Sequence, residues 1–156
     1  MLPAPPSRAA LQRVLPILMF GFGTAPIFYG AVLYLILGSG GSGSNSGTAR
    51  IGETGALTWM FGTLGLVAAL FSAMWTRLRV SPAVDRLVSD AASGDQAAGA
   101  QRDVIVALAG AEACAMAGLV LGILTRDLGA YLPFGAATLG LMAVVILPPV
   151  LRILHR

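Results

Sequence analysis

Charged side chains are scarce in this sequence. Only 11% of its 156 residues are acidic or basic, whereas a soluble domain carries roughly 25% charged residues. By contrast, 56% of the residues are hydrophobic, and the mean hydropathy is +0.82. So little charge cannot cover the surface of a water-soluble domain of this size. We therefore expect an integral membrane protein whose main partner is the lipid bilayer.

Lysine is missing altogether, and Cys114 is the single cysteine. One thiol excludes an intrachain disulfide and a cysteine-based metal centre, so we expect Cys114 to be a small packing residue. The ten basic residues are all arginines and stand singly at the ends of apolar runs. That placement suits anionic lipid headgroups rather than nucleic acid, and we expect no nucleic-acid partner. Arginine without lysine, with abundant alanine and glycine, indicates a multi-pass protein of a bacterial inner (cytoplasmic) membrane.

Four apolar runs make up most of the chain, and each is long enough to cross the ~30 Å hydrocarbon core as a helix. The predicted fold class is all-α, a single transmembrane domain over residues 1–156 built as a four-transmembrane-helix bundle. The predicted helices cover about 14–37, 55–76, 103–125 and 132–151. An outer Gly/Ser-rich loop at 38–54 and a cytoplasmic loop at 77–102 with a short amphipathic piece connect them.

The arginines also predict the orientation of the bundle. The N-terminus, the 77–102 segment and the C-terminus carry eight of them, and the other side has only Arg50 and Arg126. Because cytoplasmic segments carry an excess of basic residues, we expect both termini in the cytoplasm.

Prolines interrupt two of the predicted helices. Pro26 has no N–H to donate to the carbonyl of Phe22, four residues earlier, and its ring clashes there, so we expect a kink. Pro148 and Pro149 are expected to end the last helix early or to bend it.

Glu112 is a lone carboxylate near the middle of the third apolar run, about 13 Å along the helix from Asp103. No Arg, Lys or His lies within any of the four runs. Holding a glutamate neutral at pH 7 costs about 3.7 kcal/mol relative to its reference pKa of ~4.3. Burying an unpaired carboxylate in hydrocarbon costs considerably more, so we expect Glu112 to be protonated. Its expected acceptor is the free carbonyl of Phe22, at matching depth in a helix that runs in the same direction.

Small residues accompany this carboxylate. Ala107, Ala111, Ala115, Gly118 and Gly122 form a stripe to which Ala109 and Ala113 add, and the second helix carries Gly62, Gly65, Ala69 and Ala73 near one face. Such spacing permits close approach of backbones, within the bundle or between subunits. The candidate ion-binding site predicted from the sequence consists of Glu112, Phe22 and Ala109.

The residues around Glu112 follow a known pattern. Residues 107–113 read ALAGAEA, and GLV follows at 118–120. This segment of about 20 residues resembles the carboxylate-bearing helix of rotor-ring c subunits (proteolipids). The resemblance implies that Glu112 binds a proton or a sodium ion and that subunits assemble into a ring. Over its whole length the chain also resembles small four-helix bacterial membrane proteins with an AxAEAxxxxGLV segment before a proline-containing last helix.

Two functions remain open at this stage. The first is a small membrane protein that forms a homo-oligomer or joins other membrane subunits, with Glu112 binding a proton or cation. The alternative is an accessory or structural subunit in which Glu112 only fixes helix packing. We expect no enzyme, cofactor or metal site, because no hydroxyl has an adjacent base and His155 is the lone histidine. Tyr29, Tyr34 and Tyr131 are expected to be anchors at the membrane interface.

Overall fold

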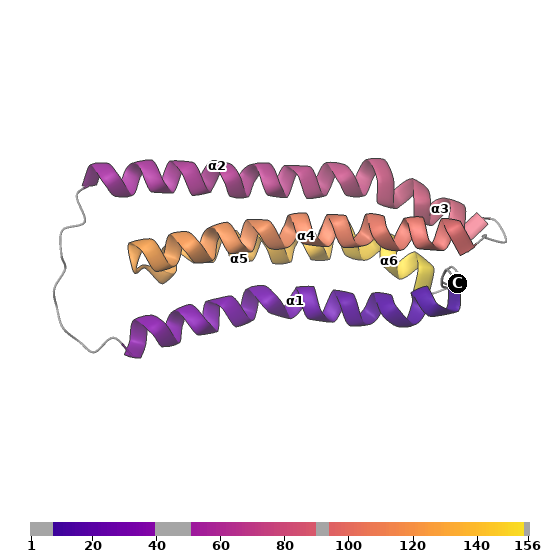
Figure 1. Cartoon of the computed structure of the whole chain (residues 1–156), viewed down its shortest axis with the longest axis horizontal. Helices are drawn as coiled ribbons and strands as arrows, with labels where there is room; N and C mark the ends of the chain where they lie inside the picture. The colour runs from indigo at the N-terminus through magenta and orange to yellow at the C-terminus, as the bar shows by residue number, and fades with distance from the viewer. Residues whose placement is uncertain (1–7, 40–50, 90–93, 155–156) are drawn as a thin grey trace, which may run out of the picture.

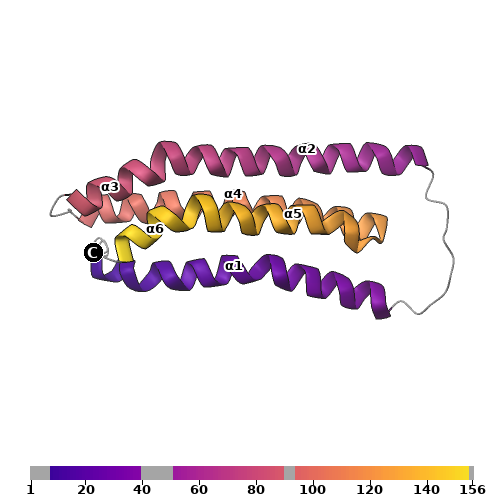
Figure 2. The same ribbon diagram turned by 180° about the vertical axis from the view of Figure 1, so that it is seen from behind.

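The computed structural model describes residues 8–39, 51–89 and 94–154, and within them the chain is helical with no strand. Four long helical columns lie side by side and alternate in direction along the chain (Figures 1 and 2). The elements are α1 (Arg8–Ser39), α2 (Ile51–Trp75), η1 (Thr76–Val80), α3 (Ser81–Ser89), α4 (Gly94–Thr125), α5 (Leu128–Leu141), η2 (Met142–Ile146) and α6 (Leu147–Leu154).

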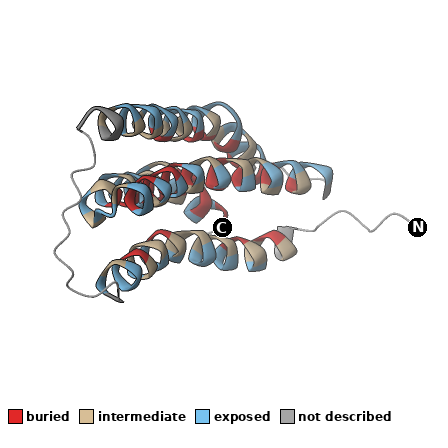
Figure 3. Ribbon diagram, turned by 60° about the vertical axis from the view of Figure 1, so that its left-hand side comes forward, coloured by how far each residue is buried: buried red, intermediate tan, exposed pale blue. Residues whose placement is uncertain are grey.

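Four stretches are long and apolar enough to span a membrane, which confirms the predicted all-α fold with four candidate spans. They are Ala10–Gly38, Gly55–Leu87, Asp95–Thr125 and Leu128–Ile153. The outward faces of the helices are apolar: Phe20 is 74% exposed and Trp59 is 80% exposed. Figure 3 shows the buried residues on the sides of the helices that face one another, with exposed residues outside. An apolar exterior of this extent suits lipid rather than water.

The helices are longer than predicted, and the described residues of the 77–102 segment are helical; its expected short amphipathic piece is α3. The second column continues through η1 and α3 to Ser89, and α4 begins at Gly94, nine residues before the predicted start at 103. The reason is packing: Ala97 and Ala100 on α4 are buried in the same cluster as Val84 and Leu87 on α3. At the other end of the bundle, only the edges of the predicted outer loop are described, and they extend α1 and α2. Residues 40–50 lie outside the described residues.

Prolines bend the second and fourth columns instead of ending them. A π-helical turn, η1 or η2, ends two residues before Pro82 and before Pro148, and helix continues after each proline. A proline ring clashes with the carbonyl four residues earlier, and one extra residue in the turn relieves that clash. Figures 1 and 2 show α3 and α6 turned away from the lines of α2 and α5. The predicted break at Pro148 therefore takes the form of a π turn followed by a bend.

Helix α4 is the centre of the bundle. It packs against α1, α2 and α5, and half of the residues in its most apolar window are buried. Two of its carbonyls accept hydrogen bonds from neighbouring helices: Ser72 on α2 donates to Ala107, at 2.7 Å, and Thr138 on α5 donates to Ala111, at 3.1 Å. Polar side chains between membrane helices stabilise one register, because lipid offers them no partner.

Replacing Ser72 with alanine is expected to destabilise the bundle by about 0.6 kcal/mol and by no more than about 1.7 kcal/mol, the mean and the maximum for hydrogen bonds between membrane helices. The hydroxyl is buried and its acceptor lies on another helix. Unfolding in mixed micelles, followed by circular dichroism, measures the change. Thr63→Ala is the matched control, since the exposed Thr63 hydroxyl bonds only to Trp59 within α2. Equal losses for both variants would contradict a specific role for Ser72.

Candidate functional site

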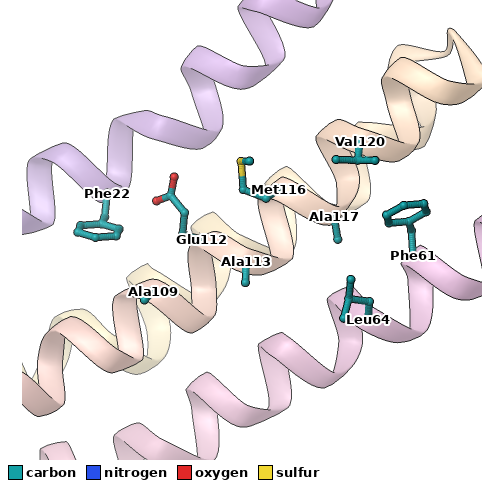
Figure 4. A pocket seen from close by; sticks show the side chains of 9 residues that line it. All are labelled: Phe22, Phe61, Leu64, Ala109, Glu112, Ala113, Met116, Ala117 and Val120. Carbon is teal, nitrogen blue, oxygen red and sulfur yellow. The ribbon is translucent and has the colours of Figure 1, made fainter.

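A groove of about 460 Å³ runs along α4, between α1 on one side and α2 on the other. Ala109, Ala113, Met116 and Val120 of α4 form its floor and are exposed. Its remaining lining residues are Phe22, Phe61, Leu64, Glu112 and Ala117 (Figure 4). The groove opens to the outside of the bundle, where its floor residues are exposed, and Glu112 is its single ionisable lining residue.

The carboxyl group of Glu112 points toward α1 and lies beside Phe22 (Figure 4). Tyr29 of α1 donates a hydrogen bond from its hydroxyl to Oε1 of Glu112. Tyr29 lies seven residues after Phe22 and three after Pro26, so the three residues share one face of α1. The Glu112 side chain is partly buried, held at the edge of the groove.

The predicted site residues do come together, although the hydrogen-bond partner differs from the prediction. Phe22, Ala109 and Glu112 line the same groove. Among the described residues, however, the hydrogen bond to Glu112 comes from Tyr29, and the Phe22 carbonyl has no bond to it. No arginine of the described ranges pairs with Glu112. The carboxyl group thus has a neutral hydroxyl as its partner and no compensating cation.

A second tyrosine supports this arrangement from α5. Tyr131 is 3% exposed, and its hydroxyl donates to the carbonyl of Pro26 in α1. Its ring packs closely against Gly30 and Gly135, where an added Cβ would lie 3.2 and 3.1 Å from ring atoms. The hydrogen bond from Tyr131 therefore joins α5 to α1 at Pro26, about one turn before Tyr29. This contact helps to position Tyr29 beside Glu112.

Two of the three tyrosines that were predicted to anchor the membrane interface have a further role in packing. Tyr29 and Tyr131 make the interhelical hydrogen bonds described above, whereas Tyr34 is 65% exposed on the outside of α1. A usable signal was present in the sequence. Tyr29 has helical spacing from Pro26 and from Phe22, whose carbonyl was the expected acceptor for Glu112.

The groove offers few ligands for a metal ion. No group of three or more His, Cys, Asp or Glu side chains gathers within residues 8–39, 51–89 and 94–154. Glu112 and the Tyr29 hydroxyl supply the polar atoms near the groove, whereas hard cations take about six or more oxygen ligands. Cys114 is buried beside Phe134 and acts as a packing residue. Among the described residues, Glu112 therefore has one side-chain partner, the Tyr29 hydroxyl.

Chemically, the site can hold a carboxyl group in either protonation state. A tyrosine hydroxyl donates to a carboxylate and can also accept from a protonated carboxyl group, so Glu112 keeps a partner in both. The residues that carry this chemistry are Glu112 and Tyr29, while Phe22 and Ala109 shape the apolar surroundings. Comparison of the chain with protein-family models, with curated proteins and with solved structures found no match, so the site stands on this geometry alone.

Proposed function

We propose that this chain is a small polytopic membrane protein in which Glu112 binds and releases a proton within the bilayer. The single observation that carries the proposal is a carboxyl group on a groove open to the outside of the bundle, with a neutral hydroxyl partner and no arginine partner among the described residues. Ionisable groups at membrane depth are costly and mark ion pathways and proton relays. Binding of a cation such as sodium at Glu112 belongs to the same proposal, but the groove supplies fewer oxygen ligands than such a cation usually takes.

The mechanism follows from the two states of one side chain. In the proposed mechanism Glu112 carries a proton while lipid covers the groove, because a carboxylate without a cation partner is costly in hydrocarbon. When water reaches the groove, the proton leaves and the Tyr29 hydroxyl donates to the resulting carboxylate. Alternating access of the two aqueous phases to the groove would convert this titration into movement of protons.

The proposed setting is a bacterial inner membrane with both termini in the cytoplasm. One end of the bundle brings together the start of α1, the end of the second column, the start of α4 and α6. The described arginines at that end are Arg8, Arg13, Arg77, Arg79, Arg86, Arg102 and Arg152, and Arg126 lies at the other. We propose further that the chain works as a homo-oligomer or with other membrane subunits, because the groove leaves one face of α4 uncovered within the single chain.

A hydrophobic carbodiimide tests the proposal, because it reacts with protonated carboxyl groups that are reachable from lipid. We expect modification of Glu112 in membranes, identified by peptide mass spectrometry, and no modification at that position in Glu112→Gln. Raising the pH should slow the reaction as the carboxyl group ionises, and protection by added sodium would identify a cation as the ligand. Absence of labelling across the pH range would overturn the proposal.

The accessory function remains the second candidate, and the Tyr29–Glu112 hydrogen bond favours it specifically. This bond joins α1 to α4 and would hold the two helices in register without any titration. Tyr29→Phe removes the hydroxyl and keeps the ring, and we expect a loss of about 1 kcal/mol in the free energy of unfolding. Tyr34→Phe is the matched control, because Tyr34 faces outward from the same helix. If Tyr29→Phe were as stable as Tyr34→Phe, the packing role would be contradicted.

A further inference from the structure

A second pocket lies at the arginine-rich end of the bundle, far along α4 from the groove that holds Glu112. Its volume is about 260 Å³, and it is lined by Trp75, Arg79, Gly99, Arg102 and Asp103. Trp75 is the last residue of α2, Arg79 lies in η1, and the other three belong to the first turns of α4. The π turn at η1 and the unexpected N-terminal extension of α4 together create this pocket.

The two arginines of this pocket have no carboxylate partner among the described residues. The guanidinium carbon of Arg79 lies 5.8 Å from the centre of the Trp75 ring, a distance at which a cation is attracted to the ring face. Arg102 comes from the facing helix and lines the same space. Asp103 also lines it, yet forms no ion pair with either arginine in the described chain. Two positive charges against one negative charge leave the pocket attractive to an anion.

The depth of the pocket indicates which anion reaches it. Tryptophan at the end of a spanning helix marks the level of lipid headgroups, and residues 102 and 103 come directly before the apolar run of α4. A planar guanidinium group binds phosphate oxygens in a bidentate manner. The carboxylate of Asp103 would repel the phosphate itself, but it can accept a hydrogen bond from a hydroxyl group on the same headgroup.

We propose that Trp75, Arg79, Gly99, Arg102 and Asp103 form a binding site for a phosphate group, most favourably that of an anionic lipid with a hydroxylated headgroup. Arg79 and Arg102 hold the phosphate, and the Trp75 ring holds Arg79 in place. Gly99 lines the pocket without a side chain, and an added Cβ there would meet nothing within 4 Å, so a larger residue has room to enter this space. This site is independent of Glu112 and of the proton-binding proposal.

Native mass spectrometry tests the site. The full chain is released from detergent in the presence of phosphatidylglycerol or phosphatidylcholine, and the amount of each lipid that stays bound is measured. Arg79→Gln and Arg102→Gln should each weaken phosphatidylglycerol binding about fivefold, the effect of one basic residue near an anionic surface. Gly99→Leu should weaken it to a similar degree, since the side chain fills the pocket without changing the charge. Asp103→Asn should strengthen phosphate binding by removing the repulsion. Arg77→Gln, which removes one charge from the same turn outside the pocket, should leave binding unchanged.

The two possible sources of the phosphate are separated by competition. Displacement of phosphatidylglycerol only by other anionic lipids identifies a headgroup site, and displacement by inorganic phosphate at similar concentration identifies a soluble phosphate; either result supports the pocket. Equal loss of binding in Arg77→Gln and Arg79→Gln, or unchanged binding in Gly99→Leu, would overturn the proposal, because diffuse surface charge would then account for the interaction. Helical content measured on each variant confirms that the bundle is folded.

Discussion

On the function proposed for Glu112, replacing it with glutamine is expected to abolish proton movement in liposomes while leaving the bundle folded. Glutamine has nearly the volume of glutamate, and its carbonyl oxygen can still accept the hydrogen bond from Tyr29. It cannot take up or release a proton near neutral pH. The measurement is the decay of an imposed pH gradient in proteoliposomes, followed by an entrapped fluorescent indicator. We expect the rate for Glu112→Gln to fall to that of empty liposomes.

The control for this experiment is Met116→Leu. Met116 lines the same groove one turn away and is 42% exposed, so the substitution alters the wall of the groove without touching a titratable group. We expect its flux to remain close to that of the unchanged protein. If Glu112→Gln carried protons as fast as the original chain, the proton-binding function would be refuted. If neither the original chain nor Glu112→Gln moved protons, and the two had the same stability and assembly, the accessory function would account better for Glu112.

The arrangement of four spanning helices was predictable because each apolar run exceeds the length that hydrocarbon requires. The helix ends were not, since they depend on contacts between segments distant in sequence. The first turns of α4 carry Asp95 and Arg102 and read as polar, yet Ala97 and Ala100 bury one face against α3. Alanine contributes little to a hydropathy pattern, so an amphipathic extension of this kind is easily taken for a loop.

The candidate site was predictable only in part, because its hydrogen bond also depends on contacts between helices. A lone carboxylate in an apolar run is visible in the sequence, and equal depth places Phe22 near Glu112. The choice between the Phe22 carbonyl and the Tyr29 hydroxyl depends on the axial register of α1 against α4. Packing sets that register, for example the close approach of Leu33 to Gly122, where an added Cβ would lie 2.6 Å from a methyl carbon. No pattern within a single helix contains this information.

The small residues of α2 also show that a sequence pattern does not reveal which positions make close contacts. Gly62 and Gly65 were both predicted to permit close helix contact, but they differ in the structure. An added Cβ at Gly62 would meet nothing within 4 Å, whereas at Gly65 it would lie 2.5 and 2.7 Å from ring atoms of Phe134. At Gly118 on α4 an added Cβ would lie 2.4 Å from the Cβ of Phe134. Phe134 therefore fills a junction of three helices that only glycine at both positions leaves open.

Substitution by alanine at these glycines is expected to give a graded loss of stability. Gly118→Ala should be the most damaging and exceed about 3 kcal/mol, the upper end of the usual cost of overpacking, because the Cβ of Phe134 cannot move without its backbone. Gly65→Ala should cost about 1–3 kcal/mol, since the ring can rotate away at some cost. Gly62→Ala is the control and should be neutral or slightly stabilising, because alanine favours helix over glycine. Unfolding in mixed micelles measures all three.

A double-mutant cycle with Phe134→Ala separates the two contacts. Phe134→Ala removes the ring but keeps the Cβ, so it should cancel the cost of Gly65→Ala, whose clash is with ring atoms alone. It should leave most of the cost of Gly118→Ala, whose nearest clash is with that Cβ. Rescue of both glycine variants, or of neither, would contradict this packing of Phe134. Since Phe134 sits between α2 and α4, the same result would test whether these two of the helices that line the Glu112 groove are held in the positions described.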